Sequence, residues 1–281
     1  LDLLVSPDSG PLRSLDVINA AGHRVVHGGE EFVRSVIIDK EVENTIDKLA
    51  VLAPLHNPSN LLGIRAAKEA LPAIPHVAVF DTAFHQSIPE HAYRYAIPGK
   101  WYRSSGIRRY GFHGTSHNYV TKRASKLLGK KVIEPKIISL HLGNGSSAAA
   151  VKNGQSIDTS MGLTPLEGLI MGTRSGDIDP GAVLYMMREG KMSPDEIDRV
   201  LNRESGFTGI TGSMSDLRDI IYAANKGDEK AELALKMAAY RIRKYIGAYT
   251  ASLGGLDAIV FTAGIGENSP LFRKLVLGNL S

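Results

Sequence analysis

The stretch that most constrains the fold is residues 136–161, KIISLHLGNGSSAAAVKNGQSIDTSM. Two short apolar runs, 137–140 and 148–151, flank a turn of glycine, asparagine and serine. Because Gly and Asn tolerate the positive φ angles of tight turns, this pattern predicts a β-hairpin. The turn, residues 143–147, offers backbone N–H groups, two hydroxyls and an amide, which can surround a phosphate. An ordinary hairpin turn without a ligand is the alternative interpretation of the same residues.

The overall composition narrows the class of protein. The chain has 281 residues, 43% of them hydrophobic and 22% charged, which is typical of a globular protein and favours two domains. The net charge is +4, but the basic residues are scattered, so we expect no nucleic-acid partner. No apolar run is long enough to cross a membrane. The absence of cysteine excludes disulfides and fits a reducing compartment.

Two strands are predicted in the first third of the chain. Residues 24–27 read as a strand running into Gly28-Gly29, and Arg24 could present its guanidinium to a carboxylate or phosphate there. A surface arginine is the alternative. Residues 76–80 read as a buried strand with Asp81 at its carboxyl end, where ligands bind in open α/β sheets. Asp81 could equally cap the segment that follows it.

Helices are predicted at 39–52 and 58–71, where apolar residues recur at helical spacing. The two prolines of the intervening APLHNP segment form a rigid turn that aims His56 in a fixed direction. His23 and His27 are four residues apart, but no third ligand is near in sequence, so we do not favour a zinc site.

A histidine stands in an unusual position within GIRRYGFHGTSHNYV, residues 106–120. His113 lies between Phe112 and Gly114, just before a helix predicted from about residue 116 to 128. His113 and His117 are four apart, but they lack the glutamate of the HExxH metalloprotease motif, so we discount metal hydrolysis. A histidine in such a turn is well placed to donate an exposed hydrogen bond.

The segment after the hairpin combines one arginine with two carboxylates. A short helix is predicted at 163–168, and Arg174 follows in a loop with Asp177 and Asp179. A local salt bridge between Arg174 and Asp177 is the simplest alternative to a functional role. Further helices are predicted at 180–188, 194–202, 216–224 and 230–253.

The last strand is predicted at 257–262, and it leads into AGIGENSP and then a helix. A strand, a Gly-rich turn and a helix N-terminus can hold a nucleotide phosphate or its ribose. The turn matches neither the P-loop nor the full GxGxxG pattern, so alone it is a weak signal. The alternation of strands and helices predicts an α/β fold.

Seven segments together resemble the acetate kinase (acetokinase) family, in the order of that family and over almost the whole chain. They are HRVVHGGE (23–30), APLHNP (53–58), VFDTAFHQSIP (79–89), YGFHGTSH (110–117), HLGNGSS (141–147), DTSMGLTPLEGLIMGTRSGDIDP (158–180) and FTAGIGENS (261–269). The resemblance implies the acetate and sugar kinase/Hsp70/actin superfamily, with two RNase H-like lobes and a nucleotide cleft between them. The expected division is a partial N-terminal lobe, 1–81, and a C-terminal lobe, 82–281.

The resemblance also implies the site residues. Arg24, Asp81, His113 and Arg174 match catalytic residues: the arginines bind carboxylate or phosphoryl oxygens, the aspartate is associated with Mg²⁺ (or Mn²⁺) and substrate, and the histidine hydrogen-bonds the transferred phosphoryl group. The substrate pocket comprises Val26, Leu55, His56, Phe112 and Pro165. The residues expected to bind ATP or ADP are His141, Asn144, Gly145, Asp216, Leu217, Arg218, Gly264, Ile265, Gly266, Glu267 and Asn268.

The implied activity is reversible, ATP-dependent phosphorylation of acetate to acetyl phosphate, in a cytoplasmic homodimer. Phosphoryl transfer needs positioning and charge neutralisation, which two guanidinium groups, an imidazole and Mg²⁺ supply. Acetate is already an anion near neutral pH, so we expect Asp81 to act through metal and positioning and not as a base.

Propionate or butyrate kinase is the close alternative, and a nucleotide-binding member of the superfamily without activity is the distant one. The family's first strand with its Asn/Ser-rich turn, and its late active-site glutamate, have no counterpart in these residues. The 281 residues are therefore expected to be either a fragment or the ordered part of a longer chain, and we favour the second interpretation because a fragment would expose a sheet edge.

Overall fold

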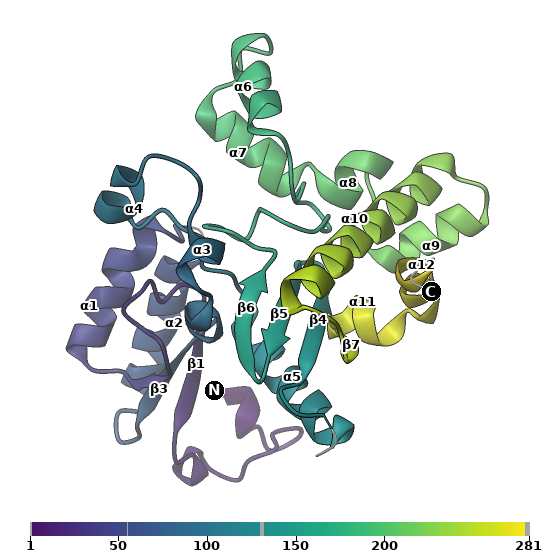
Figure 1. Cartoon of the computed structure of the whole chain (residues 1–281). Coiled ribbons are helices and arrows are strands. Elements are labelled where there is room, and N and C mark those ends of the chain that lie inside the picture. The colour runs from purple at the N-terminus through teal and green to yellow at the C-terminus, as the bar shows by residue number, and fades with distance from the viewer. Residues whose placement is uncertain (1, 55, 130–131, 279–281) are drawn as a thin grey trace. The chain divides into compact units, whose positions relative to one another are not determined.

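The computed structural model describes residues 2–54, 56–129 and 132–278. The chain divides into two compact units, residues 1–83 (unit 1) and 84–281 (unit 2), and each is described by itself (Figure 1). None of the helices in the described ranges combines the length and the apolar character needed to span a lipid bilayer.

Unit 1 is built on a three-stranded sheet of order β1-β3-β2. Strands β1 (Ala21–Val25) and β3 (His76–Phe80) run parallel, and β2 (Val36–Ile37) is antiparallel to β3. Helices α1 (Lys40–Lys48) and α2 (Asn57–Ala70) contribute Ile46, Leu61 and Ile64 to the core of this unit. The buried core consists of Val25, Ile38, Ile46, Leu61, Ile64, Ala78 and Phe80. Because β1 and β3 are parallel, their carboxyl ends lie at the same edge of the sheet.

Unit 2 contains a four-stranded sheet of order β6-β5-β4-β7. The predicted hairpin is confirmed: β4 (Lys136–Leu142) and β5 (Ser146–Lys152) are antiparallel neighbours. The sheet continues through β6 (Gln155–Thr159), which the sequence reading missed, and through β7 (Ala258–Thr262), which is parallel to β4.

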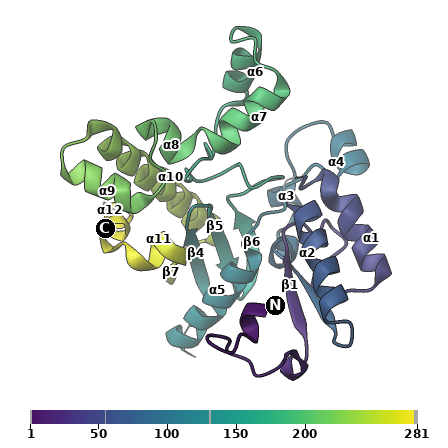
Figure 2. The same cartoon turned by 180° about the vertical axis from the view of Figure 1, so that it is seen from behind.

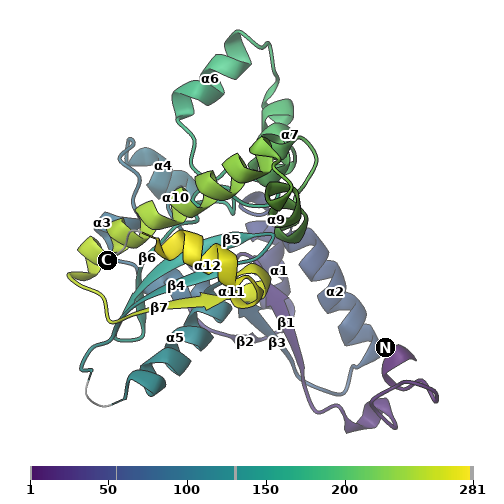
Figure 3. The same cartoon turned by 90° about the vertical axis from the view of Figure 1, so that its right-hand side faces the viewer.

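Helices cover both faces of this sheet. Helix α10 (Glu229–Leu253) lies over one face and α5 (Gly114–Leu128) over the other (Figures 1, 2 and 3). The remaining helices are α3 (Glu90–Tyr93), α4 (Lys100–Ser105), α6 (Pro180–Arg188), α7 (Pro194–Arg203), α8 (Gly206–Thr211), α9 (Leu217–Asn225), α11 (Ala263–Asn268) and α12 (Pro270–Leu277). The largest core lies between the sheet and α10, where Ile138, Leu140 and Leu142 alternate along β4 with residues that face α5.

The predicted helices of unit 2 from residue 180 to 253 are confirmed, as is the last strand. Other predictions need correction. The AGIGEN segment, predicted as a turn, forms helix α11 directly after β7. The segment 163–168 is a series of turns and not a helix, because Gly168 adopts a positive φ of 108°. The first strand spans 21–25 and not 24–27, since the backbone turns away after Val25. Helix α5 begins at Gly114 and not near residue 116.

Candidate active site

In unit 1, Arg24 and Asp81 form a bidentate ion pair at the carboxyl edge of the sheet. Arg24 Nε donates to Asp81 Oδ1 at 2.9 Å, and Nη2 donates to Oδ2 at 2.5 Å. The parallel register, with Arg24 opposite Val79, brings the two residues together. Asp81 is buried (2% exposed side chain), whereas the arginine side chain is 63% exposed. The hydrogen bonds that Arg24 donates to Asp81 raise the pKa of Arg24, so the guanidinium stays charged and its direction is fixed.

The loop that follows β1 is held by the start of α2. The backbone N–H of Val26 donates to Asn60 Oδ1, and that of His27 donates to Asn57 Oδ1, both at 3.1 Å. His27 is fully buried and its Nδ1 accepts from the Gly29 N–H, so burial lowers the pKa of His27 to about 4. These bonds fix the backbone of the loop at Val26, whose side chain is half-buried.

Two other predicted pocket residues belong to unit 1. His56 is half-buried at the N-cap position of α2. Leu55 lies outside the described residues. His23, considered above for zinc, instead bonds through Nε2 to His76 Nδ1 at 2.9 Å.

In unit 2, His113 is held in a left-handed backbone conformation (φ 57°, ψ 22°) as the N-cap of α5. Such a conformation is uncommon outside glycine and persists only where the surroundings impose it. His113 Nδ1 lies 2.8 Å from Ser147 Oγ, and its ring stacks on His141 with centroids 4.1 Å apart. His141 in turn bonds to Ser116 Oγ at 2.8 Å. The predicted residues His113 and His141 therefore lie side by side.

Arg174 lies next to His113 across the hairpin turn. A Cβ added to Gly145 would lie 3.6 Å from both Arg174 Nη1 and His113 Nε2. The arginine donates to the Pro165 carbonyl at 3.2 Å, and burial without a facing carboxylate lowers its pKa. Unit 2 thus brings together four predicted residues: His113, Gly145, Pro165 and Arg174.

The alternative pairing of Arg174 with Asp177 is not what the structure shows. Asp177 accepts from Tyr245 Oη at 2.9 Å and lies 3.3 Å from Arg241 Nη1. It also accepts from the Gly168 N–H at 2.8 Å, so it braces the turns around residue 168. The position of Asp177 leaves Arg174 directed toward the hairpin.

The hairpin turn packs closely on the loop that carries Arg174. The Gly172 N–H donates to the Asn144 carbonyl at 3.0 Å, and a Cβ on Gly172 would collide with Asn144 Oδ1. Any larger residue at 172 would therefore displace Asn144. This contact was not predicted, although the glycine stands in the quoted MGTRSG sequence.

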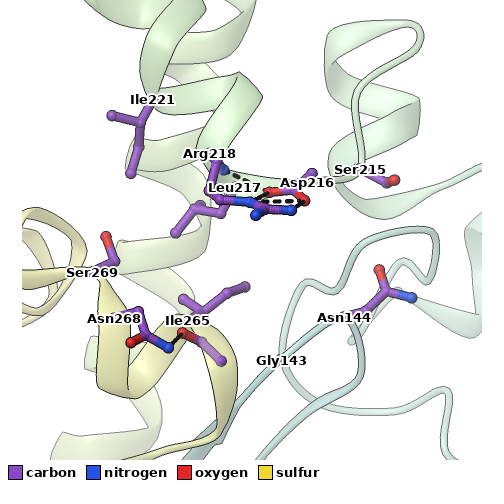
Figure 4. Close-up of a pocket in the computed structure, with 11 residues that line it drawn as sticks. Gly143, Asn144, Ser215, Asp216, Leu217, Arg218, Ile221, Ile265, Asn268 and Ser269 are labelled. Carbon is purple, nitrogen blue, oxygen red and sulfur yellow. Dashed lines mark hydrogen bonds and ion pairs between the residues drawn. The ribbon is translucent and has the colours of Figure 1, made fainter. Parts of the chain in front are cut away.

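A pocket of about 820 Å³ is lined in part by the hairpin turn, through Gly143 and Asn144 (Figure 4). The predicted nucleotide-binding residues that line it are Asn144, Asp216, Leu217, Arg218, Gly264, Ile265 and Asn268. Its remaining lining residues, Gly143, Ser215, Ile221 and Ser269, were not predicted as nucleotide-binding residues. The volume is within the range of small-molecule sites.

Asp216 and Arg218 form an exposed ion pair on this wall, with Arg218 Nη2 donating to Asp216 Oδ2 at 2.6 Å (Figure 4). Asp216 also caps α9 by accepting from the Arg218 N–H. These hydrogen bonds lower the pKa of Asp216 to about 2.

Four predicted nucleotide-binding residues, His141, Gly145, Gly266 and Glu267, do not line the pocket. Glu267 accepts from Thr262 Oγ1 at 3.0 Å and from the Ala263 N–H at 3.1 Å, which ties the end of β7 to α11. Gly266 packs against the backbone of Phe261, where a Cβ would approach to 3.3 Å. Both residues belong to α11, the helix that presents Gly264 and Ile265.

A half-buried ionic group supports the loop that contains Pro165. Arg109 donates to the carbonyls of Thr159, Ser160 and Met161, and to Glu167 at 2.5 Å. Tyr95 Oη donates to the same glutamate at 2.8 Å, and burial raises the pKa of that tyrosine. Sequence reasoning missed this group, although the adjacent arginines 108 and 109 and the Glu in TPLEG were signals for it.

The residues present suit a magnesium ion only as partial ligands. Asp81 is a hard oxygen donor, and each of its oxygens retains a lone pair beyond the bond to Arg24. Mg²⁺ is commonly held by one or two carboxylates, water and substrate phosphates. In the described part of the chain, no three His, Cys, Asp or Glu side chains are grouped to hold a metal. Asp81 would thus be the one protein ligand that the described residues supply.

Comparison with known proteins identifies the family. The profile of the Acetokinase family matches residues 7–281. An acetate kinase of Dictyoglomus thermophilum is 58% identical over 278 residues, covering 99% of this chain and 70% of that protein.

Two crystal structures are similar over nearly the whole chain. That of Porphyromonas gingivalis acetate kinase is 49% identical with a TM-score of 0.95, covering 99% of this chain and 70% of the other. That of a propionate kinase from Francisella tularensis is 47% identical with a TM-score of 0.91, covering 94% and 68%. These likenesses confirm the predicted α/β class with RNase H-like lobes. The chain is therefore a member of the acetokinase family.

Proposed function

We propose that this chain catalyses the reversible, ATP-dependent phosphorylation of acetate to acetyl phosphate. Family membership and the acetate kinases among its relatives support this activity. The catalytic residues proposed are Arg24 and Asp81 in unit 1 and His113 and Arg174 in unit 2. The residues proposed to bind the acid are Val26, Leu55 and His56 of unit 1, and Phe112 and Pro165 of unit 2.

The observation that carries the proposal is that the hairpin turn contacts both the pocket and the proposed catalytic residues of unit 2. Its Asn144 lines the 820 Å³ pocket, while Gly145 lies against His113 and Arg174. A nucleotide in the pocket could thus extend its phosphates along the turn toward an imidazole and a guanidinium. A binding protein without phosphoryl transfer has no need of that second group of residues.

The reaction requires charge neutralisation more than covalent help. An acetate oxygen attacks the γ-phosphorus, the bond from phosphorus to the β–γ bridging oxygen breaks, and ADP leaves with that electron pair. Arg174 supplies a positive charge, and His113 an N–H donor, for oxygens of the transferred group. Because Arg174 is half-buried, its interaction with an anion is less screened than in water.

The proposed role of Asp81 is to orient Arg24 and to serve as one magnesium ligand. The hydrogen bonds between Arg24 and Asp81 hold the guanidinium in one orientation, in which it would bind a carboxylate or phosphoryl group. Magnesium, when bound with ATP, neutralises charge on the phosphate oxygens.

A base at position 81 is not needed, since acetate is already deprotonated. We expect Asp81→Asn to lower kcat and weaken the metal dependence together. If that variant kept the normal metal dependence and regained rate as the pH rose, the carboxylate would be acting as a base and this role would be wrong.

Acetyl phosphate formation tests the function directly. The chain is incubated with acetate, ATP and Mg²⁺, and acetyl phosphate is trapped with hydroxylamine as the coloured hydroxamate. Turnover that is lost in His113→Ala, while ATP still binds to the pocket, supports the proposal. ATP binding with no acetyl phosphate above the His113→Ala background would leave a nucleotide-binding protein and overturn it.

Propionate is the second candidate substrate, and butyrate the third. The propionate kinase at a TM-score of 0.91 shows that the same fold serves the longer acid. The relative kcat/KM values for acetate, propionate and butyrate decide between them. The homodimer, the cytoplasmic location and the absence of a nucleic-acid partner stay proposals that rest on the family resemblance and the composition.

A further inference from the structure

A line of hydrogen-bonding groups runs from His113 into the interior of unit 2. His113 Nδ1 lies 2.8 Å from Ser147 Oγ, which also lies 2.8 Å from His117 Nε2. His117 Nδ1 lies 2.9 Å from Ser139 Oγ. We call His113, Ser147, His117 and Ser139 the histidine–serine chain. All of its members except His113 are fully buried.

The fold places these groups by simple periodicity. Ser139 on β4 and Ser147 on β5 belong to the strand positions that alternate with core residues such as Leu140 and Ala148. They therefore face α5, which covers that side of the sheet and carries His117 one turn after His113. The histidine–serine chain therefore forms only where the hairpin and α5 pack together.

Counting protons gives the histidine–serine chain a direction. Burial, with three other imidazoles nearby, keeps the pKa of His117 well below its ordinary value, so this ring is neutral with one donor and one acceptor nitrogen. Each serine has a single hydroxyl proton. Three arrangements make all three bonds: one runs outward to His113, one runs inward to Ser139, and in the third both His113 Nδ1–H and His117 Nε2–H donate to Ser147. The third is costly, because the buried Ser147 hydroxyl proton then has no acceptor among the hydrogen-bonding groups that the described residues place beside it.

The inward arrangement leaves a buried donor without an acceptor. In it His113 donates to Ser147, Ser147 to His117, and His117 Nδ1–H to Ser139. The Ser139 hydroxyl proton then needs an acceptor, and within the described residues its hydroxyl contacts no hydrogen-bonding group besides His117. A buried donor without a partner is costly, whereas an unused hydroxyl lone pair costs little.

We propose that Ser139, His117 and Ser147 are positioning residues that hold His113 neutral with its hydrogen on Nε2. In this outward arrangement Ser139 donates to His117 Nδ1, His117 Nε2–H donates to Ser147, and Ser147 donates to His113 Nδ1. The remaining N–H of His113 is then the one beside Gly145 and Arg174. This inference deepens the proposed function, since that N–H is the donor assigned to the phosphoryl group.

The histidine–serine chain does no acid–base work in this arrangement. No proton moves during transfer, because both acetate and acetyl phosphate react without gaining or losing one at the attacking oxygen. The contribution is a ring fixed in one tautomer and one orientation before substrate binds, which is the general advantage of a preorganised donor.

Nitrogen NMR of the histidine rings reads the tautomers without any turnover. Protein labelled with ¹⁵N is examined by long-range ¹H–¹⁵N correlation near neutral pH, and the rings are assigned by substituting each histidine. We expect both His113 and His117 as single Nε2–H tautomers. An Nδ1–H tautomer on either ring would overturn the proposal.

Variants test whether these residues orient the His113 ring or only support the fold. Ser147→Ala should release His113, so that its nitrogen shifts become an average of two tautomers, and kcat should fall about 5- to 10-fold while the acetate KM changes less than 2-fold. Ser156→Ala is the matched control, because it removes an equally short buried bond, 2.8 Å from Ser156 Oγ to His85 Nδ1, outside the histidine–serine chain. An equal loss of kcat in both variants, with the His113 tautomer unchanged, would contradict the proposal.

A second pair of variants tests the donor on His117. The amide nitrogen of His117→Gln can still donate to Ser147, whereas His117→Leu cannot. We expect the Gln variant to stay within 2-fold of the wild-type kcat and the Leu variant to behave like Ser147→Ala. Should the Leu variant fail to fold, Ser147→Ala still decides the matter. Correct tautomers in a chain that makes no acetyl phosphate would refute the proposed function alone.

Discussion

The two catalytic arginines proposed here are held in opposite ways. In unit 1, Arg24 is largely exposed and paired through two hydrogen bonds with a buried carboxylate, Asp81. In unit 2, Arg174 is half-buried and donates to the Pro165 carbonyl and, weakly, to the Met171 sulfur. Among the described residues, no carboxylate forms a salt bridge with Arg174, and burial alone lowers its pKa.

This difference gives the two arginines different roles, orientation for Arg24 and positive charge for Arg174. The positive charge of Arg24 is largely cancelled by Asp81, so this guanidinium contributes direction and hydrogen bonds. The charge of Arg174 is uncompensated, so an arriving anion would replace lost hydration as well as form hydrogen bonds. The comparison predicts that Arg174 binds an anion more strongly and contributes less to the stability of the empty protein.

The largest effect is expected from removing the uncompensated charge. Arg174→Ala should lower kcat/KM for acetyl phosphate formation by about 10²- to 10³-fold, which is the usual cost of losing one donor to a charged transition state. Steady-state kinetics with acetate and ATP measure it. Arg174→Lys is the matched control, because it keeps the charge and loses the planar fork. A loss below about 10-fold in the Ala variant would contradict the comparison.

The buried His27 shows how a group that can lose its proton responds to burial, in contrast to Arg174. Arg174 cannot lose its proton in a protein, whereas His27 in unit 1 responds to burial by staying neutral. Its pKa falls from 6.5 to about 4, so the unfolded chain binds a proton between those values and the folded chain does not. His27 therefore stabilises the fold fully above pH 6.5, and that contribution is lost as the pH falls toward 4, by about 3 kcal/mol in total.

Denaturant unfolding between pH 7.5 and 4.5 measures this loss. His27→Gln, which is neutral at every pH, is the matched variant, and its free energy of unfolding should fall less steeply in this window. His117 in unit 2, whose pKa is also lowered by burial, supplies a background slope in both proteins. Parallel curves for wild type and His27→Gln would show that His27 is not held neutral.

The sequence predicted those elements whose signals are local. The hairpin followed from Asn144 and its flanking glycines, and the strand before Asp81 from its run of apolar residues. The resemblance supplied the site residues, and the structure gathers many of them at the hairpin turn. What local signals could not provide was the bond between Arg24 and Asp81, which are 57 residues apart, because only the sheet register brings them together.

Other features depend on distant partners in the same way. The helix predicted at 163–168 does not form, because Gly168 adopts a positive φ with its N–H donating to Asp177, while Arg109 holds the Glu167 side chain. The role of Ser147 is invisible in sequence, since GNGSS predicts only a polar turn. Its bonds to two histidines exist because α5 packs against the hairpin.

Selectivity for the acid offers a test of unit 1 that does not involve charge. If Val26 forms part of the pocket for the methyl group, Val26→Ala should enlarge that pocket and favour propionate over acetate by about 1–3 kcal/mol. The ratio of kcat/KM values for the two acids measures this change. The variant keeps the hydrogen bond from the backbone N–H of residue 26 to Asn60, so the loop should keep its position. An unchanged ratio would place Val26 outside the pocket.

The smallest effect tests the contrast between the two arginines in the absence of substrate. Arg24→Ala leaves the buried Asp81 carboxylate without its ion pair and should destabilise the fold by about 1–2 kcal/mol, less than for a fully buried pair because Arg24 is exposed. Arg174→Ala removes a desolvated cation and should change stability by less than about 0.5 kcal/mol. Denaturant unfolding compares the two, and Arg24→Ala/Asp81→Asn should recover part of the loss by removing the stranded charge. If Arg174→Ala proved the more destabilising, Arg174 would be mainly a structural residue of unit 2, and the division between direction and charge would be wrong.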